Sequence, residues 1–283
     1  MTSARLLVLG DSHPPEAAAR HLASSGMLPV EAGTSNRVPE TMEGTALWVD
    51  TSGATRLLNA GLELPLLSPG SAWLSTVPGY LLGRRVLCTT LGQLQEKWRG
   101  PGLFRLAEQQ YAGLGFPTFH ADPATFVAAA GKYHYRALDL VAELNVVVSA
   151  PVDYVDEYRV FVADGEISAS TRVDTRLRPG KRTDAYEGDE EDRTAAALHF
   201  AQIVLDATVW HQPPGFRIDV GLTADGSWQL ISAGPSWAAQ FHLANPSGVL
   251  ASVLSGQAPD YDHWKWVPDE LFQQRIFRAW PAA

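Results

Sequence analysis

Residues 216–234 carry the pattern that most constrains the fold of this chain: two alternating apolar stretches separated by a turn sequence. Asp225-Gly226 lies between the stretches, and this dipeptide favours a two-residue hairpin turn because both positions tolerate positive φ. A turn of known length fixes the pairing of the residues around it, so the register of the hairpin can be predicted. The expected pairs are Ala224 with Ser227, Leu222 with Gln229, Val220 with Ile231, and Asp219 with Ser232.

Asp219 and Ser232 therefore share one face of the predicted sheet, whereas Val220, Leu222 and Ile231 share the apolar face. A carboxylate on such a face is either a solvated strand residue or one wall of a site. Two facing carboxylates would form a platform for Mg²⁺, since hard cations prefer fixed oxygen ligands. Because Asp219 faces a serine, the sequence supplies only one of these two carboxylates.

A second hairpin is predicted over residues 157–172, with Asp164-Gly165 at its turn. One of its faces is apolar and the other is charged. The charged face is either the floor of a polar cleft or a solvated surface. In the second case an ion pair of Glu157 with Arg172 would contribute less than about 1 kcal/mol. The expected pairs are Val162 with Ile167, Arg159 with Ser170, and Glu157 with Arg172.

The remaining elements alternate between strands and helices at the N-terminus and are mixed beyond it. A strand–helix–strand–helix order favours a small α/β lobe with parallel strands. The apolar run Asn145–Ser149 is typical of a strand buried on both faces. We also expect two extended pieces between residues 116 and 130. The other predicted strands are 5–10 and 46–50, and the predicted helices are 14–24, 51–58, 193–209 and 246–255.

The composition excludes several classes of function. The chain has 283 residues and a formal net charge of −9, which argues against general nucleic-acid binding because that needs a basic surface. No apolar run is as long as a membrane span, and the N-terminus lacks the pattern of a signal peptide. Cys88 is the single cysteine, so we expect no intrachain disulfide and a cytoplasmic location. The oligomeric state is left open, a homodimer included.

Lys132, His134 and Arg136 form a cluster of cationic side chains. If this piece is extended, strand alternation places all three on one side. Such a cluster suits a phosphate or a carboxylate, and the alternative is a solvated edge strand. The sequence contains no zinc-binding helix motif, no nucleophile elbow and no phosphate-binding P-loop.

The order of these pieces resembles the ATP-grasp superfamily, and in particular its short bacterial ATP-grasp-domain proteins. The similarity extends from about Trp73 to Leu254, and its most specific parts are EYRVFVADGE at 157–166 and the region from IDVG at 218–221 to NPSG at 245–248. The resemblance implies an α+β fold in which two subdomains enclose a cleft. It divides the chain into a small α/β lobe at 1–85 and an ATP-grasp-like domain at 86–283, with a subdomain break near 150.

The resemblance also implies ATP and Mg²⁺ as cofactors of a carboxylate–amine ligase that acts on a small molecule or a peptide. Arg159 and Lys132 would be its catalytic residues, and Asp219 would be the metal ligand. Lys132 would also contact the phosphates, Arg172 would belong to the same apparatus, and a ribose-binding acid would be Asp153, Asp156 or Glu157. The adenine-contacting hinge would include Ser149, Pro151 and Val152.

The sequence departs from the family pattern where the cofactors should bind. Ala128, Ser232 and Gly234 replace the expected lysine, glutamate and asparagine. A lone carboxylate binds Mg²⁺ weakly, and phosphoryl transfer without a bridging metal loses its main electrostatic stabilisation. Two hypotheses follow: a ligase with a rearranged site, or a pseudo-ligase that binds a ligand for regulation, transport or metal-free catalysis.

Overall fold

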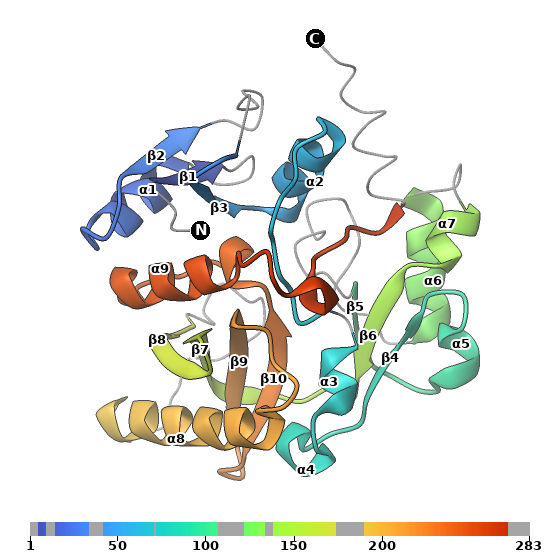
Figure 1. Cartoon of the computed structure of the whole chain (residues 1–283). Coiled ribbons are helices and arrows are strands. Elements are labelled where there is room, and N and C mark those ends of the chain that lie inside the picture. Colours follow the sequence, from blue (N-terminus) through green and yellow to red (C-terminus); the bar gives the residue numbers. More distant parts are fainter. Residues whose placement is uncertain are drawn as a thin grey trace.

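The computed structural model describes residues 5–9, 15–33, 42–70, 72–106, 122–133, 138–173 and 190–270. Within these residues the strands form three sheets, and the helices pack around them (Figure 1). The sheets follow each other along the chain except that two helices, α3 (Trp73–Thr76) and α4 (Gly79–Leu82), connect the first to the second.

The first sheet is parallel and has the order β2-β1-β3. Helix α1 follows β1, and helix α2 follows β3. Asp50 caps α2, because its Oδ1 accepts a hydrogen bond of 2.7 Å from the backbone N–H of Gly53. The predicted strand–helix order of the N-terminus is therefore confirmed. The elements are β1 (Arg5–Leu9), α1 (Pro15–Ala23), β2 (Val30–Gly33), β3 (Thr45–Val49) and α2 (Thr51–Asn59).

The second sheet is antiparallel, with the order β4-β6-β5. Its central strand β6 is the predicted apolar run, and Val146–Ser149 are buried. The elements are β4 (Val86–Thr90), α5 (Leu94–Lys97), β5 (Leu103–Leu106), α6 (Pro123–Tyr133), α7 (Leu138–Ala142) and β6 (Asn145–Ser149).

Helix α6 corrects the prediction of an extended piece up to residue 130. Asp122 begins the helix, since its Oδ1 accepts from the backbone N–H of Thr125 at 2.8 Å. The alanines that follow favour a helix, and the buried Phe126 stacks on Phe104 with the ring centroids 5.4 Å apart. Strand alternation therefore does not apply at Lys132, which lies in α6, and His134 and Arg136 lie outside the described residues.

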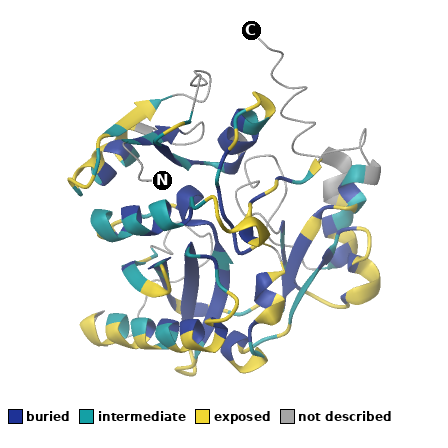
Figure 2. Ribbon diagram, viewed as in Figure 1, coloured by how far each residue is buried: buried dark blue, intermediate teal, exposed yellow. Residues whose placement is uncertain are grey.

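The third sheet is antiparallel, with the order β10-β9-β7-β8, and α8 and α9 cover its two faces (Figure 1). Its central strand β9 is buried throughout (Figure 2). The helices α8 and α9 confirm the helices predicted at 193–209 and 246–255. The elements are β7 (Tyr154–Ala163), β8 (Glu166–Arg172), α8 (Glu190–Thr208), β9 (Gly215–Thr223), β10 (Trp228–Gly234) and α9 (Pro246–Ser255).

The hairpin of β9 and β10 contains two register offsets that cancel. Its loop is one residue longer than predicted: the Gly226 N–H donates to the Thr223 carbonyl at 3.0 Å, the Thr223 N–H donates to the Ser227 carbonyl at 2.9 Å, and Gly226 has φ of 85°. Leu222 therefore pairs with Trp228 and Val220 with Leu230, which corrects the prediction. A β-bulge between Leu230 and Ser232 then restores the predicted pairing of Ser232 with Asp219.

The hairpin of β7 and β8 is shifted by a similar irregularity. Val162 pairs with Ile167 as predicted, but a bulge follows, so Arg159 pairs with Thr171 and Arg172 with Tyr158. The predicted pairs Arg159 with Ser170 and Glu157 with Arg172 are wrong for this reason. A one-residue shift moves a side chain to the other face of the sheet, so Arg172 lies on the face of Tyr158.

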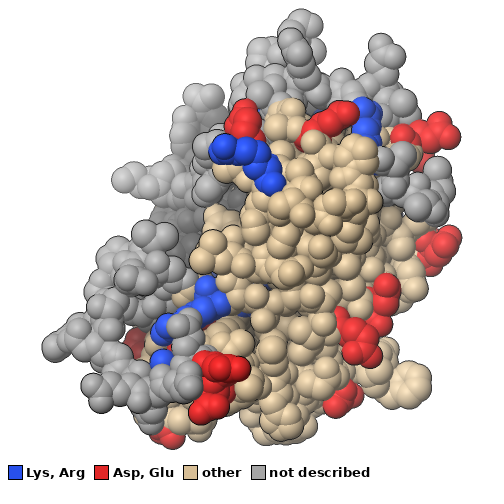
Figure 3. Space-filling model, turned by 90° about the vertical axis from the view of Figure 1, so that its left-hand side faces the viewer, with Lys and Arg blue, Asp and Glu red and all other residues tan. Residues whose placement is uncertain are grey.

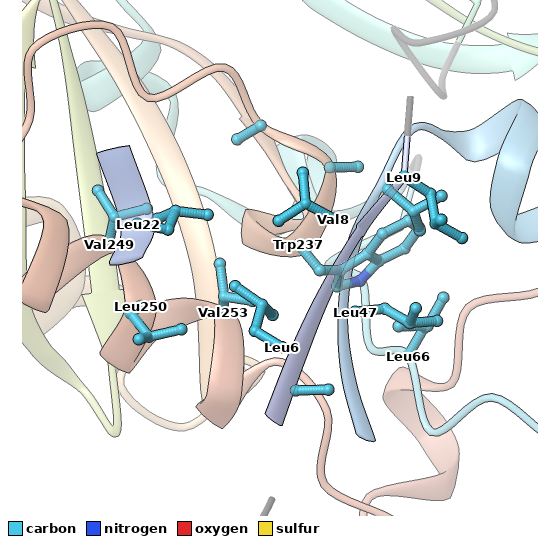
Figure 4. Close-up of a cluster of buried hydrophobic side chains, with 14 of the residues drawn as sticks. Leu6, Val8, Leu9, Leu22, Leu47, Leu66, Trp237, Val249, Leu250 and Val253 are labelled. Carbon is cyan, nitrogen blue, oxygen red and sulfur yellow. The ribbon is translucent and has the colours of Figure 1, made fainter. Parts of the chain in front are cut away.

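A buried cluster joins the first sheet to the third. Trp237 lies in the short 3₁₀ helix η3 (Ser236–Ala238) after β10, and its Nε1 donates to the Leu67 carbonyl at 2.7 Å. Its indole is fully buried among side chains of the first sheet, and the same cluster includes Val249, Leu250 and Val253 of α9 (Figure 4). The C-terminal part of the described chain returns to this region through η4 (Asp262–Trp264) and a bridge of Leu67 with Lys265.

Two surface properties bear on partners. On the face shown in Figure 3, acidic side chains are scattered among uncharged residues, and the described residues there form no continuous basic band. None of the helices that the structure describes is long and apolar enough to cross a membrane.

Candidate active-site cleft

The candidate site lies on the face of the third sheet that is opposite to α8. Alternate residues of β9 define the two faces: Phe216, Ile218 and Val220 pack in the apolar cluster with α8, whereas Arg217 and Asp219 point the other way. Arg159 on β7 is paired with Asp219 in the neighbouring strand, and Ser232 faces Asp219 from β10. The sheet therefore brings both the predicted catalytic arginine and the predicted metal ligand together.

Asp219 is held by three side chains. Arg159 makes a forked contact, with Nε 2.8 Å from Oδ1 and Nη2 3.3 Å from Oδ2. Ser232 Oγ donates to Oδ2 at 2.7 Å, and Arg217 Nη1 also donates to Oδ2. The same Arg217 nitrogen donates to Ser232 Oγ at 2.7 Å, which closes a small network.

This network decides the charge state of the carboxyl. Burial alone would raise the pKa of Asp219, but the charges of Arg159 and Arg217 and hydrogen bonds from Arg159 and Ser232 lower that pKa well below its usual value. The carboxyl is 11% exposed, and the guanidinium of Arg217 is 3% exposed. Asp219 is therefore an ionised, buried anion at neutral pH.

Two further arginines approach the same place from the second sheet. Arg84 precedes β4, and its Nη1 and Nη2 donate to the carbonyls of Leu230 at 2.7 Å and Ile231 at 2.9 Å. Arg105 on β5 donates from Nη2 to the same Ile231 carbonyl at 3.2 Å. The bulge in β10 leaves this carbonyl outside the regular pairing with β9, where it accepts both guanidinium groups.

Arg84 and Arg105 carry positive charge into a partly buried place. Burial lowers the pKa of Arg84. Burial and then the charges of Arg84 and Arg217 lower the pKa of Arg105 to about 10. Neither side chain forms an ion pair with a carboxylate among the residues that the structure describes. The arrangement therefore has an excess of guanidinium groups, which suits an anionic ligand.

The residues present do not fit a Mg²⁺ ion at Asp219. Both carboxylate oxygens already accept from arginine, and the position opposite supplies only the hydroxyl of Ser232. The described residues contain no group of three or more histidines, cysteines, aspartates or glutamates that could hold a metal. Asn245 in the following loop caps α9, since its Oδ1 accepts from the N–H groups of Ser247 at 3.0 Å and Gly248 at 3.2 Å.

Arg172 lies outside this cleft, contrary to the prediction. Its Nε donates to Asp156 Oδ1 at 2.6 Å, and Arg193 of α8 donates to Asp156 Oδ2 at 3.1 Å. This ion-pair network therefore lies on the α8 face of the sheet. Glu157, the predicted partner of Arg172, is buried and lies on the opposite face with Arg159.

The predicted hinge connects the second sheet to the third. Ser149 is the last residue of β6 and is buried, whereas Pro151 and Asp153 are exposed and Val152 is half-buried. The segment is fixed at one point, because the Ala150 N–H donates to the Arg85 carbonyl at 3.0 Å. Contacts of these residues with a nucleotide remain a prediction.

Sequence reasoning missed Arg84, Arg105 and Arg217. A signal existed for Arg217, because it lies two residues before Asp219 in a strand and must share its face. The contact of Arg84 and Arg105 with β10 depends on how the second sheet docks on the third. Ala128, the position expected to replace a lysine, is exposed on α6.

The loop between β10 and α9 connects this cleft to the first sheet. Arg159 Nη1 donates to the Gln240 carbonyl at 2.7 Å. The neighbouring Ala239 carbonyl accepts from Trp48 Nε1 at 3.0 Å, and Phe241 stacks on His21 with the ring centroids 4.7 Å apart. Both partners of the loop belong to the N-terminal elements.

Comparison with known proteins agrees with this architecture. A sequence profile of the ATP-grasp domain, describing the second family of one clade of that superfamily, matches residues 81–252. The chain belongs to this family. Its fold is therefore the α+β ATP-grasp fold, as the resemblance implied.

Among solved structures, D-cycloserine synthetase DcsG supports the same fold. The chain is 14% identical to it, with a TM-score of 0.54 over 89% of this chain and 98% of that chain. The chain is also similar to N5-carboxyaminoimidazole synthase from Aspergillus clavatus, with 12% identity, a TM-score of 0.49, and coverage of 89% of this chain and 77% of that chain. A third match is the ATP-grasp ligase PsnB, with 13% identity, a TM-score of 0.43, and coverage of 90% of this chain and 100% of that chain. No curated protein sequence matches the chain.

Proposed function

We propose that this ATP-grasp protein is a pseudo-ligase: it binds an anionic ligand in the arginine-lined cleft and does not perform Mg²⁺-dependent ATP chemistry. The ligand would carry a phosphate or a carboxylate, the two groups whose geometry a guanidinium fork matches. The single observation that supports this function is the engagement of Asp219 by Arg159, Arg217 and Ser232.

The argument rests on how phosphoryl transfer is stabilised. ATP-dependent phosphoryl transfer develops charge that bridging metal ions neutralise. A carboxylate already paired with two guanidinium groups is a poor ligand for such an ion. The cleft nevertheless keeps positive charge, so binding of an anion is retained while the usual catalytic assistance is lost.

The second candidate is an active carboxylate–amine ligase with a rearranged site. The observation that favours it is the convergence of Arg84 and Arg105 on the Ile231 carbonyl beside Asp219. Arginine clamps can stabilise a transferring phosphoryl group in place of part of the metal charge. In this case ATP would activate a small-molecule or peptide carboxylate, and Arg159 and Lys132 would act on the phosphates.

A thermal-shift titration separates the two candidates. The ligands are ATP, ADP and inorganic triphosphate, each with EDTA and with Mg²⁺, and ADP release is measured with a panel of carboxylates and amines. We expect stabilisation in EDTA, of about 2.7 kcal/mol at a hundredfold excess over Kd, and no ADP release. Stabilisation that requires Mg²⁺ together with ADP release would establish the ligase.

Two variants locate the effect. Arg105→Met removes a guanidinium from the cleft and should abolish the shift. Arg193→Met removes a guanidinium from the α8 face of the same sheet and should leave the shift unchanged. Equal loss in both variants, or no shift with any anion in the wild-type protein, would contradict anion binding in this cleft.

A further inference from the structure

Arg217 occupies the space between the positions that face each other across the hairpin. Its Nη1 contacts both Asp219 Oδ2 and Ser232 Oγ, on β9 and β10. In the family pattern these two positions carry the acidic ligands of the metal. A positive charge therefore stands where a cation would be bridged, but it belongs to the protein's own side chain.

Gly234 shows that this placement is built into the hairpin. Gly234 pairs directly with Arg217 across the two strands. A Cβ atom at Gly234 would lie 3.0 Å from Arg217 Nη2 and 3.3 Å from Cζ. Any longer side chain would meet the plane of the guanidinium, so an asparagine at position 234 and the present conformation of Arg217 exclude each other.

The same geometry explains Ser232. A glutamate at this position would extend past the Oγ atom that Arg217 now contacts, whereas the serine hydroxyl both accepts from Arg217 and donates to Asp219. Ser232, Gly234 and Arg217 thus form one matched set: two positions have lost side chains that bind metal, and the third supplies a cation.

We infer that Arg217 is a resident cation that replaces the divalent metal ion of this cleft, so that the site is metal-independent by construction. This inference deepens the proposed function, because it gives the reason why an anion would bind here without Mg²⁺. The guanidinium keeps Asp219 neutralised at all times, whereas an exchangeable metal would do so only when bound.

The test uses Mn²⁺ alone as the probe, with no nucleotide present. Binding is measured by electron paramagnetic resonance and by calorimetry in the full-length protein. We expect no Mn²⁺ binding that depends on Asp219 in the wild-type protein. The double variant Arg217→Ser with Ser232→Glu removes the resident cation and adds a carboxylate, so it should bind Mn²⁺ at least about tenfold more tightly, since ligand charge sets the affinity of hard cations.

Three controls make the result specific. Arg217→Lys retains a cation and should remain without Mn²⁺ binding. Ser232→Glu alone should also bind no Mn²⁺, because the new carboxylate pairs with Arg217 instead. Arg193→Ser frees part of Asp156 on the opposite face and should not gain a site, which excludes a general effect of removing an arginine beside an aspartate.

Each outcome decides the inference. Mn²⁺ binding by the wild-type protein that Asp219→Asn abolishes would overturn it, and so would a folded double variant that gains no binding. If the double variant does not fold, Ser232→Glu decides, because Mn²⁺ binding by that variant contradicts a resident cation. The titration of anions in EDTA uses no metal, so its failure would refute the proposed function and leave this result standing.

Discussion

Replacing Asp219 by asparagine is the sharpest perturbation of the cleft. The substitution keeps the size of the side chain but removes the negative charge between Arg159 and Arg217. The two guanidinium groups, which are 14% and 3% exposed, would then remain in the protein without their anion. Removing one partner of a buried ion pair typically costs about 3–5 kcal/mol, because the other charge stays buried without compensation.

We therefore expect Asp219→Asn to lower the free energy of unfolding by about 3–5 kcal/mol. The matched control is Asp156→Asn on the opposite face. One of its partners, Arg172, is 43% exposed and can return to water, so the loss should be smaller, about 1–2 kcal/mol. Urea unfolding followed by fluorescence of the buried tryptophans measures both values.

The pH dependence gives an independent check with a defined sign. The folded-state pKa of Asp219 lies below its unfolded value of about 3.9, so its stabilising contribution is fully present above that value. The contribution decreases as the pH falls from about 5 toward the folded-state pKa. Stability should therefore fall less steeply in Asp219→Asn than in the wild-type protein below pH 5. A loss under about 1 kcal/mol at pH 7 with parallel pH profiles would refute the account of this network.

Two further substitutions test the packing and the charge excess. Arg105→Met should raise the free energy of unfolding by about 1 kcal/mol while it abolishes anion binding, because it removes a charge that its surroundings disfavour; a less stable variant would contradict this. Gly248→Ala would normally favour a helix, but its Cβ would lie 1.9 Å from the Ser168 carbonyl oxygen, so calorimetry should show a loss of about 1–3 kcal/mol rather than a gain.

Local patterns predicted most of the elements but not the side on which each residue lies. The turn at Asp225-Gly226 correctly marked a hairpin, and the predicted facing of Asp219 by Ser232 is confirmed. That success depends on two errors of opposite sign: the loop has one residue more than predicted, and the bulge at Ile231 shifts the register back. Bulges have a weak sequence signal, because they depend on contacts such as those of Arg84 with the β10 carbonyls.

The arginine cluster shows the other limit of the sequence. Arg159 could be placed beside Asp219 from alternation and family resemblance alone. Arg105 could not, because its strand, β5, pairs with β6 rather than with the strands of the cleft. Helix α6 was mistaken for a strand because an apolar run of this length fits either element until Asp122 is recognised as its cap.

The loop after β10 limits how the protein can be divided for experiments. The profile match ends at residue 252 and begins at residue 81, so a fragment cut to these limits would retain Arg159 but lose Trp48 and His21. Without that indole and imidazole, the carbonyl that holds the second end of the Arg159 guanidinium has no scaffold behind it. The N-terminal elements thus act as the back wall against which the family domain is fixed, and affinities measured on the excised domain would describe a different cleft.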